Sequence, residues 1–115
     1  MANELYAKQH PDPLRETDDA SKAVQKTKNR ISLDFILSQI AYEEYLENRT
    51  TPHLTICVLT MKNGFVVIGK SAPADPHNFD ESLGKKFAKE DAVRQLWPLM
   101  AFSLRDQMTN TRYDG

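Results

Sequence analysis

The stretch that decides the fold spans residues 54–71 and is LTICVLTMKNGFVVIGKS. Two aliphatic runs flank Asn63-Gly64, a pair typical of a tight hairpin turn because both residues tolerate positive φ. A two-residue type I′ turn at this point would pair Met61 with Val66. The sequence therefore predicts a β-hairpin at the centre of the chain.

Both faces of this predicted hairpin are largely apolar. A two-stranded hairpin is marginally stable alone in water, and large apolar patches are uncommon on soluble monomers. We expect helices to cover part of this surface and oligomerisation to extend or cover the rest of the sheet. The sequence thus predicts a homo-oligomer, with the strands or the C-terminal helix at the seam.

Apolar residues before the hairpin have helical spacing. Leu33, Ile36, Leu37 and Ile40 recur at i, i+3, i+4 and i+7. The polar stretch AYEEYLEN, residues 41–48, extends this pattern. The sequence therefore predicts one helix from Ser32 onward, ending before the Thr-Thr-Pro at residues 50–52.

A proline-containing connector, residues 71–80, leads to a long C-terminal helix. Asn78 followed by Glu81 resembles a capping box, which predicts a helix start at this point. Small residues at 84, 88 and 92 recur every four positions and would let another element approach closely. Pro98 removes a backbone donor and predicts a kink or a split of this helix.

These elements predict an α+β fold with an N-terminal helix, a central hairpin and a proline-kinked C-terminal helix. Residues 1–31 are predicted to form a polar arm, with a marginal helix between Thr17 and Arg30. Residues 32–115 are predicted to form a single domain, as the chain length of 115 residues suggests.

Composition excludes several classes of protein. The net charge of −1 provides no basic field for nucleic acid or anionic lipid. Cys57 is the only cysteine, so an internal disulfide is impossible and a reducing compartment fits. The sequence contains no apolar stretch long enough to span a membrane and no apolar signal region. The expected location is the cytoplasm.

The sequence does not predict catalysis or metal binding. His53 and Cys57 share one strand face but are separated by about 13 Å, too far to chelate one zinc ion. Ser71, Asp75 and His77 lack the framing motif of a nucleophilic site and fit turn chemistry better. We therefore predict no catalytic residue, no metal and no cofactor.

Two sets of residues are candidates for binding. If the connector forms one wall of a cleft between protomers, Ser71, His77 and Asn78 would supply hydrogen bonds. Lys85 or Lys86 would then supply positive charge for a small anionic ligand. The second set follows Pro98 and is predicted to form core or an oligomer interface, where aromatic residues and methionine are enriched: Trp97, Met100, Phe102 and Met108.

Several of these motifs occur together in a known family. The matching pieces are LTMKNGF at 59–65, Asp75-Pro76 with Asn78-Phe79-Asp80, and the small-residue series that ends at Leu96-Trp97. Over roughly residues 32–105 the chain resembles a family of small tailed-phage and prophage proteins labelled phage gene product forty-nine/sixty-six. The resemblance provides no known catalytic residue, so none is assigned.

The resemblance implies a phage accessory protein outside the virion structure. Together with the lack of a catalytic constellation, it predicts a non-enzymatic binding protein in the host cytoplasm. Such a protein would antagonise a host defence factor or sequester a small ligand. The alternative is a nucleic-acid-associated accessory factor in phage replication or regulation. The lysines and arginines of this chain are mixed with acids, however, which favours a solvated helix face over a nucleic-acid-binding surface.

Overall fold

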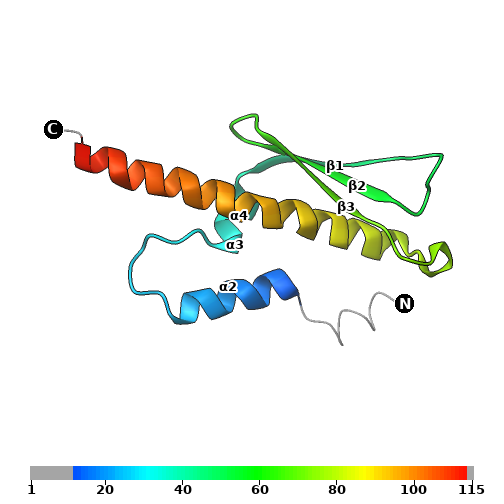
Figure 1. The fold of residues 1–115 in the computed structure, drawn as a ribbon, viewed down its shortest axis with the longest axis horizontal. Helices are drawn as coiled ribbons and strands as arrows, with labels where there is room; N and C mark the ends of the chain where they lie inside the picture. The colour runs from blue at the N-terminus through cyan, green and yellow to red at the C-terminus, as the bar shows by residue number, and fades with distance from the viewer. Residues whose placement is uncertain (1–11, 114–115) are drawn as a thin grey trace.

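The computed structural model describes residues 12–113 and has the predicted α+β class. The elements are α2 (Pro13–Ala23), α3 (Leu33–Ser38), β1 (Ile40–Leu46), β2 (Thr55–Met61), β3 (Val66–Ser71), the 3₁₀ turn η1 (Pro76–Asn78) and α4 (Glu81–Tyr113). The strands form one antiparallel sheet in the order β1-β2-β3. Helix α4 runs along one face of this sheet, and α2 lies on the far side of α4 (Figure 1). None of the described helices is both long and apolar enough to cross a membrane.

The helix predicted from Ser32 onward is wrong beyond Ser38. Ser32 caps α3 by accepting a hydrogen bond from the Phe35 amide, and α3 ends after six residues. Residues 40–46 instead form β1, which pairs with β2. The central hairpin is therefore part of a three-stranded sheet. The backbone N–H and C=O groups of β1 are hydrogen-bonded through its pairing with β2 instead of within a helix.

The hairpin is present, but its predicted register is wrong by one residue. Thr60, rather than Met61, lies opposite Val66. The loop has three residues, because the Gly64 amide donates to the Met61 carbonyl at 2.9 Å. Gly64 has a φ of +88° and is the only described residue with a clearly left-handed backbone. This is a type I turn closed by a left-handed glycine, the usual three-residue hairpin loop.

Small residues on α4 bring the helix against the sheet. Ala88 and Ala92 are fully buried and face Gly69 of β3, where no side chain separates the two backbones. The core forms around this contact from residues on the inner face of the sheet, on α3 and on α4: Leu33, Ile36, Cys57, Leu59, Met61, Val67, Val93 and Leu96. The predicted four-residue repeat therefore marks the helix face that packs on the sheet.

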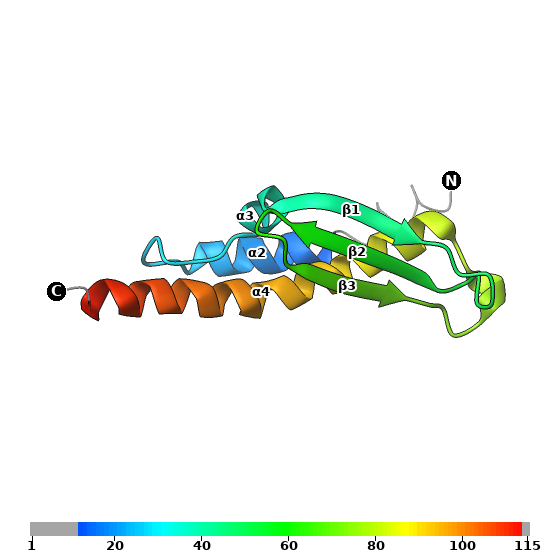
Figure 2. The same cartoon turned by 90° about the horizontal axis from the view of Figure 1, so that it is seen from above.

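Pro98 does not split the C-terminal helix. Helix α4 continues unbroken from Glu81 to Tyr113 with Pro98 inside it. Figure 2 shows the part beside the sheet slanting relative to the part that extends past it. Pro98 is exposed, so the Arg94 carbonyl that lacks its helical donor is on the solvent side of the helix.

Helix α2 is attached to the domain through Asp18. The predicted marginal helix from Thr17 to Arg30 has different bounds, because Asp12 caps a helix that starts at Pro13 and ends at Ala23. The Asp18 carboxylate accepts from Arg30 at 2.7 Å and from the Leu33 amide at 3.0 Å. It is almost fully buried, and Leu14 on the same helix is also buried. Residues 1–11 of the predicted arm lie outside the described part of the chain.

The attachment of α2 should depend on pH. Burial alone would raise the pKa of Asp18, but its hydrogen bonds from Arg30 and Leu33 outweigh burial and lower that pKa below its ordinary value. A lowered pKa means that the stabilising contribution is present above about pH 3.9, the unfolded value, and is lost as pH falls through the folded value. We therefore expect α2 to detach in acid.

Trp97 provides the measurement, since its Nε1 donates to the Ile31 carbonyl at 2.9 Å beside this attachment. Fluorescence of this single tryptophan should change below about pH 4 in the wild type. Asp18→Asn should show the change already at pH 7, with a loss of about 2 kcal/mol in the free energy of unfolding. Identical curves for the two proteins would contradict this account.

The connector between β3 and α4 contains two successive caps. Asp75 accepts from the His77 amide at 3.0 Å and starts η1. Asp80 accepts from the Leu83 amide at 2.9 Å at the start of α4. The predicted capping box at Asn78 is therefore wrong, because Asn78 ends η1 and the helix begins three residues later. The Phe79 side chain, between the two caps, is half-buried.

The caps predict a contrast between two neighbouring substitutions. Asp80→Ala should reduce the free energy of unfolding by about 1 kcal/mol, because the Leu83 amide loses its acceptor. Asn78→Ala should cost only a few tenths of a kcal/mol, since Asn78 is exposed and does not cap α4. Urea denaturation measures both. An equal loss for the two variants would show that the start of α4 has been misassigned.

Candidate functional site

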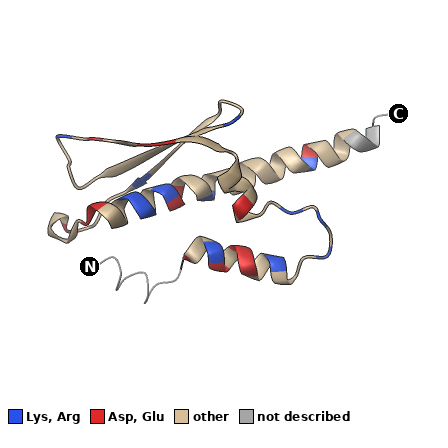
Figure 3. Ribbon diagram, turned by 180° about the vertical axis from the view of Figure 1, so that it is seen from behind, with Lys and Arg blue, Asp and Glu red and all other residues tan. Residues whose placement is uncertain are grey.

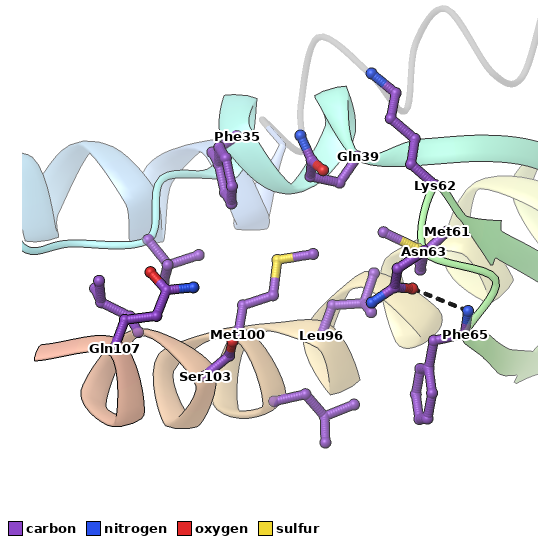
Figure 4. A pocket seen from close by; sticks show the side chains of 13 residues that line it. Phe35, Gln39, Met61, Lys62, Asn63, Phe65, Leu96, Met100, Ser103 and Gln107 are labelled. Atoms are coloured by element: carbon purple, nitrogen blue, oxygen red, sulfur yellow. Dashed lines mark hydrogen bonds between the residues drawn. The ribbon is translucent and has the colours of Figure 1, made fainter. Parts of the chain in front are cut away.

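A groove lies between α3, the β2–β3 turn and the part of α4 that extends past the sheet (Figure 4). Its volume is about 400 Å³, within the range of ligand sites. The groove is lined by Ile31, Phe35, Gln39, Met61, Lys62, Asn63, Phe65, Leu96, Leu99, Met100, Ser103, Leu104 and Gln107. Three chain segments that are distant in the sequence thus meet in one site.

Apolar side chains make up most of the groove lining, and four of them are aromatic or contain sulfur. Phe35 on α3 and Phe65 after the turn lie at separate ends, with Met61 and Met100 between them (Figure 4). Both rings are about half exposed, 48% for Phe35 and 52% for Phe65. Aromatic rings offer large apolar contact areas, and methionine side chains adapt to irregular surfaces. This surface is suited to an apolar binding partner.

The lining contains one charged side chain, Lys62. The Lys62 amide donates to the Gln39 carbonyl at 2.9 Å, which ties the turn to the end of α3. The Asn63 side chain accepts from the Phe65 amide at 2.9 Å and fixes the turn (Figure 4). The groove therefore has a fixed rim and no acidic side chain among its lining residues, and the Lys62 ammonium extends away from the groove (Figure 4).

The stretch of α4 beside the groove is unusually free of charge. Residues 95–104 contain no Asp, Glu, Lys or Arg. Figure 3 shows the charged positions of α4 gathered mainly along its half beside the sheet. This composition matches a helix segment that presents an apolar face to a partner.

The connector residues predicted to bind a ligand do not line this groove. Ser71 pairs with Thr55 at the end of β3. His77 and Asn78 are exposed on η1, and the Nδ1 atom of His77 lies 3.1 Å from the Asp75 carboxylate. Hydrogen bonds from the backbone and side chain of His77 lower the pKa of Asp75. The contacts of Asp75 and His77 are local to one turn.

Lys85 and Lys86 point toward different neighbours. The Lys85 ammonium lies 3.3 Å from Glu81 and 5.5 Å from the centre of the Tyr45 ring. It lines a cavity formed with the β1–β2 loop. Lys86 pairs with the buried Glu90 and lines another cavity, near α2 and α3. The structure thus places these two lysines in separate sites.

The four predicted interface residues also divide between surfaces. Met100 lines the groove, whereas Trp97 and Met108 line a neighbouring cavity facing the loop after α2. Phe102 is 70% exposed and lines neither. No element within the described residues covers its ring.

A polar cluster between β1 and α4 contains the cysteine. Lys89 lies 2.8 Å from the Glu43 carboxylate, which also accepts from the Tyr45 hydroxyl at 2.8 Å. Burial raises the pKa of Tyr45 and, beside it, that of Cys57. A raised pKa keeps the thiol protonated, and the thiolate is the form that attacks or binds metal. The described residues hold no group of three or more potential metal-ligating side chains.

Sequence reasoning missed the groove because its walls come together only in the folded chain. Phe35 lies outside the apolar stripe of α3, and Phe65 follows the turn glycine. The available signal in the sequence was a phenylalanine at each of these positions, and both side chains are about half exposed in the structure.

Comparison with known proteins identifies the chain. No curated protein and no solved structure matches it. The model of the phage protein (N4 Gp49/phage Sf6 gene 66) family matches residues 31–108, which include α3, the sheet and most of α4. This range contains all of the groove. The chain belongs to the phage protein (N4 Gp49/phage Sf6 gene 66) family.

Proposed function

We propose that this phage protein is a non-enzymatic accessory protein that binds a host protein in the host cytoplasm and thereby antagonises a host factor, such as a defence component. The observation that carries the proposal is the groove. It is open, most of its lining residues are apolar, and Lys62 is its one charged lining residue.

The lining of the groove supports a partner of a particular chemistry. An apolar segment, such as one face of an amphipathic helix, would bury its side chains against Phe35, Met100 and Phe65. A carboxylate at the end of that segment that leaves the groove on the Gln39 side would pair with Lys62, whose ammonium extends that way (Figure 4). The partner we propose is therefore an apolar protein segment with an acidic end.

Sequestration of a small ligand is the second candidate. The volume of about 400 Å³ would accommodate a small molecule with an apolar body and a negative charge. The groove is open and its wall comes from three chain segments, which favours a protein segment. The capture experiment below separates the two candidates, since a small ligand would appear in the low-mass fraction.

Binding of nucleic acid has less support from the structure. Two sets of cations are candidates. On α4 each of the four has a carboxylate neighbour: Lys85 has Glu81, Lys86 has Glu90, Lys89 has Glu43 and Arg94 has Glu90. In the other set, Arg30 pairs with Asp18, whereas Lys22, Lys26 and Lys28 are exposed and have no ion pair among the described residues. These pairs reduce the positive field that phosphates would meet. A gel shift repeated at two salt concentrations tests this alternative.

The proposal is tested by affinity capture from host lysate with three baits. The first is the wild type. The second is Phe35→Ser/Leu99→Ser, which removes apolar surface from the groove at two half-exposed positions and should leave the fold intact. The third is Phe102→Ser, a matched control that removes an exposed apolar side chain outside the groove.

We expect a defined host protein to be retained by the wild type and by Phe102→Ser, and to be lost from the groove variant. Circular dichroism must show that all three proteins are folded. Retention of the same proteins by all three baits, or a specific partner that Phe102→Ser alone loses, would overturn the proposal.

A further inference from the structure

The sheet has an apolar face that no described helix covers (Figures 1 and 2). Alternate residues of each strand point to this face, away from α4. The register places Tyr42, Thr60 and Val66 in one row, Glu44, Val58 and Ile68 in the next, and Leu46, Ile56 and Lys70 in the third. Its apolar members include side chains that are about half exposed or more, 47% for Val66, 56% for Ile68 and 67% for Tyr42.

Addition of a strand at the β3 edge is blocked by side chains from α4. Gln95 donates to the Ile68 carbonyl at 2.8 Å, and Asp91 accepts from the Lys70 amide at 2.9 Å. These are backbone groups that an added strand would need. A partner that uses the sheet is therefore directed to its open face rather than to this edge.

The two charged residues of the open face lie on opposite edge strands. Glu44 is on β1 and Lys70 is on β3, with the apolar residues of β2 between them. Both side chains are exposed, and neither has an ion-pair partner among residues 12–113. An apolar strip with a negative charge at one border and a positive charge at the other is complementary to a rotated copy of itself.

We propose that a second copy of this chain packs face to face on the sheet, related by a two-fold axis parallel to β2. Such an axis places β1 of one protomer over β3 of its partner. Glu44 then lies one row, about 7 Å along the strand, from the partner's Lys70, a separation that the two long side chains can bridge. The pair forms twice, once at each border of the seam.

The perpendicular two-fold axis is disfavoured by the same charges. That axis would place β1 over the partner's β1 and bring two Glu44 carboxylates together at the middle row. Like charges across an interface are repulsive, so the charge pattern selects the first arrangement. The seam uses no residue of the α3–α4 groove. The dimer proposal and the proposed function can therefore be tested, and refuted, independently.

Sedimentation equilibrium tests the location of the seam with two variants, each of which replaces an exposed apolar side chain with lysine. The wild type should have twice the chain mass of 13.1 kDa at micromolar concentration. Ile68→Lys, on the open face, should be monomeric, whereas Phe102→Lys, on α4, should remain dimeric. A monomeric wild type at 100 µM, or a dimer that Phe102→Lys breaks and Ile68→Lys does not, would overturn the proposal.

A charge exchange tests the orientation. Glu44→Lys alone and Lys70→Glu alone should each weaken the dimer at least tenfold, because each creates like-charge pairs at both borders. The double variant Glu44→Lys/Lys70→Glu should restore the dissociation constant to within threefold of the wild type. If the single variants have no effect, or if the double variant is weaker than both, the arrangement is not the one proposed. Asp106→Lys, an exposed change on α4, serves as the control for altered net charge and should leave the dimer unchanged.

Discussion

Gly69→Ala should reduce the free energy of unfolding by about 3 kcal/mol or more, an unusually large effect for the addition of one methyl group. A Cβ atom at this position would overlap the Ala88 carbonyl oxygen and lie 2.5 Å from the Ala92 nitrogen. Both are backbone atoms of α4, so no side-chain rotation can relieve the contact. The helix would have to move away from the sheet along the contact that forms the core.

Urea denaturation measures this loss, with Gly64→Ala as the matched control. A methyl group added at Gly64 would meet no atom within 4 Å, so this variant should suffer only from the positive φ of 88°, at about 1 kcal/mol. A loss for Gly69→Ala no larger than that of Gly64→Ala would mean that α4 does not approach β3 as closely as described.

Leu59→Ala should cost about 3 kcal/mol, because it opens a cavity at the centre of the core. Leu59 is in the middle of β2, has 0% exposure and faces α4. The matched control is Val58→Ala, the preceding residue on the opposite face of the same strand. Val58 is half-buried, and its truncation should cost about 1 kcal/mol in the monomer.

Comparison of Leu59→Ala with Val58→Ala also tests whether a second chain covers the open face of the sheet. If a second chain covers Val58, the cost of Val58→Ala should rise with protein concentration, whereas that of Leu59→Ala should not. Equal costs for the two variants at low concentration would contradict the assignment of the buried face.

The sequence predicted the fold class and the small-residue contact of α4, because both depend on local patterns. Asn63-Gly64 correctly indicated a hairpin, but the loop length, and with it the register, depends on whether Asn63 adopts a left-handed backbone, which it does not. The same register fixes which residues share a row with Glu44.

The third strand could not be predicted from local spacing. Ile40 completes a helical pattern that begins at Leu33, yet it is the first residue of β1. Pairing of residues 40–46 with β2 decided the outcome, and that pairing joins residues as far apart in the sequence as Ile40 and Met61. The groove could not be predicted from the sequence for a related reason, since α3, the turn and α4 each contribute only part of its wall.

Hydrogen–deuterium exchange of the protein, alone and with the host protein retained in the capture experiment, most directly tests the claim that the α3–α4 groove is the binding site. The account predicts slower exchange at the backbone amides of α3 and of residues 62–65 in the complex. Exchange at the connector, residues 71–80, should be unchanged. Protection of the connector and of the neighbouring Lys85 and Lys86, with α3 and residues 62–65 unaffected, would contradict it.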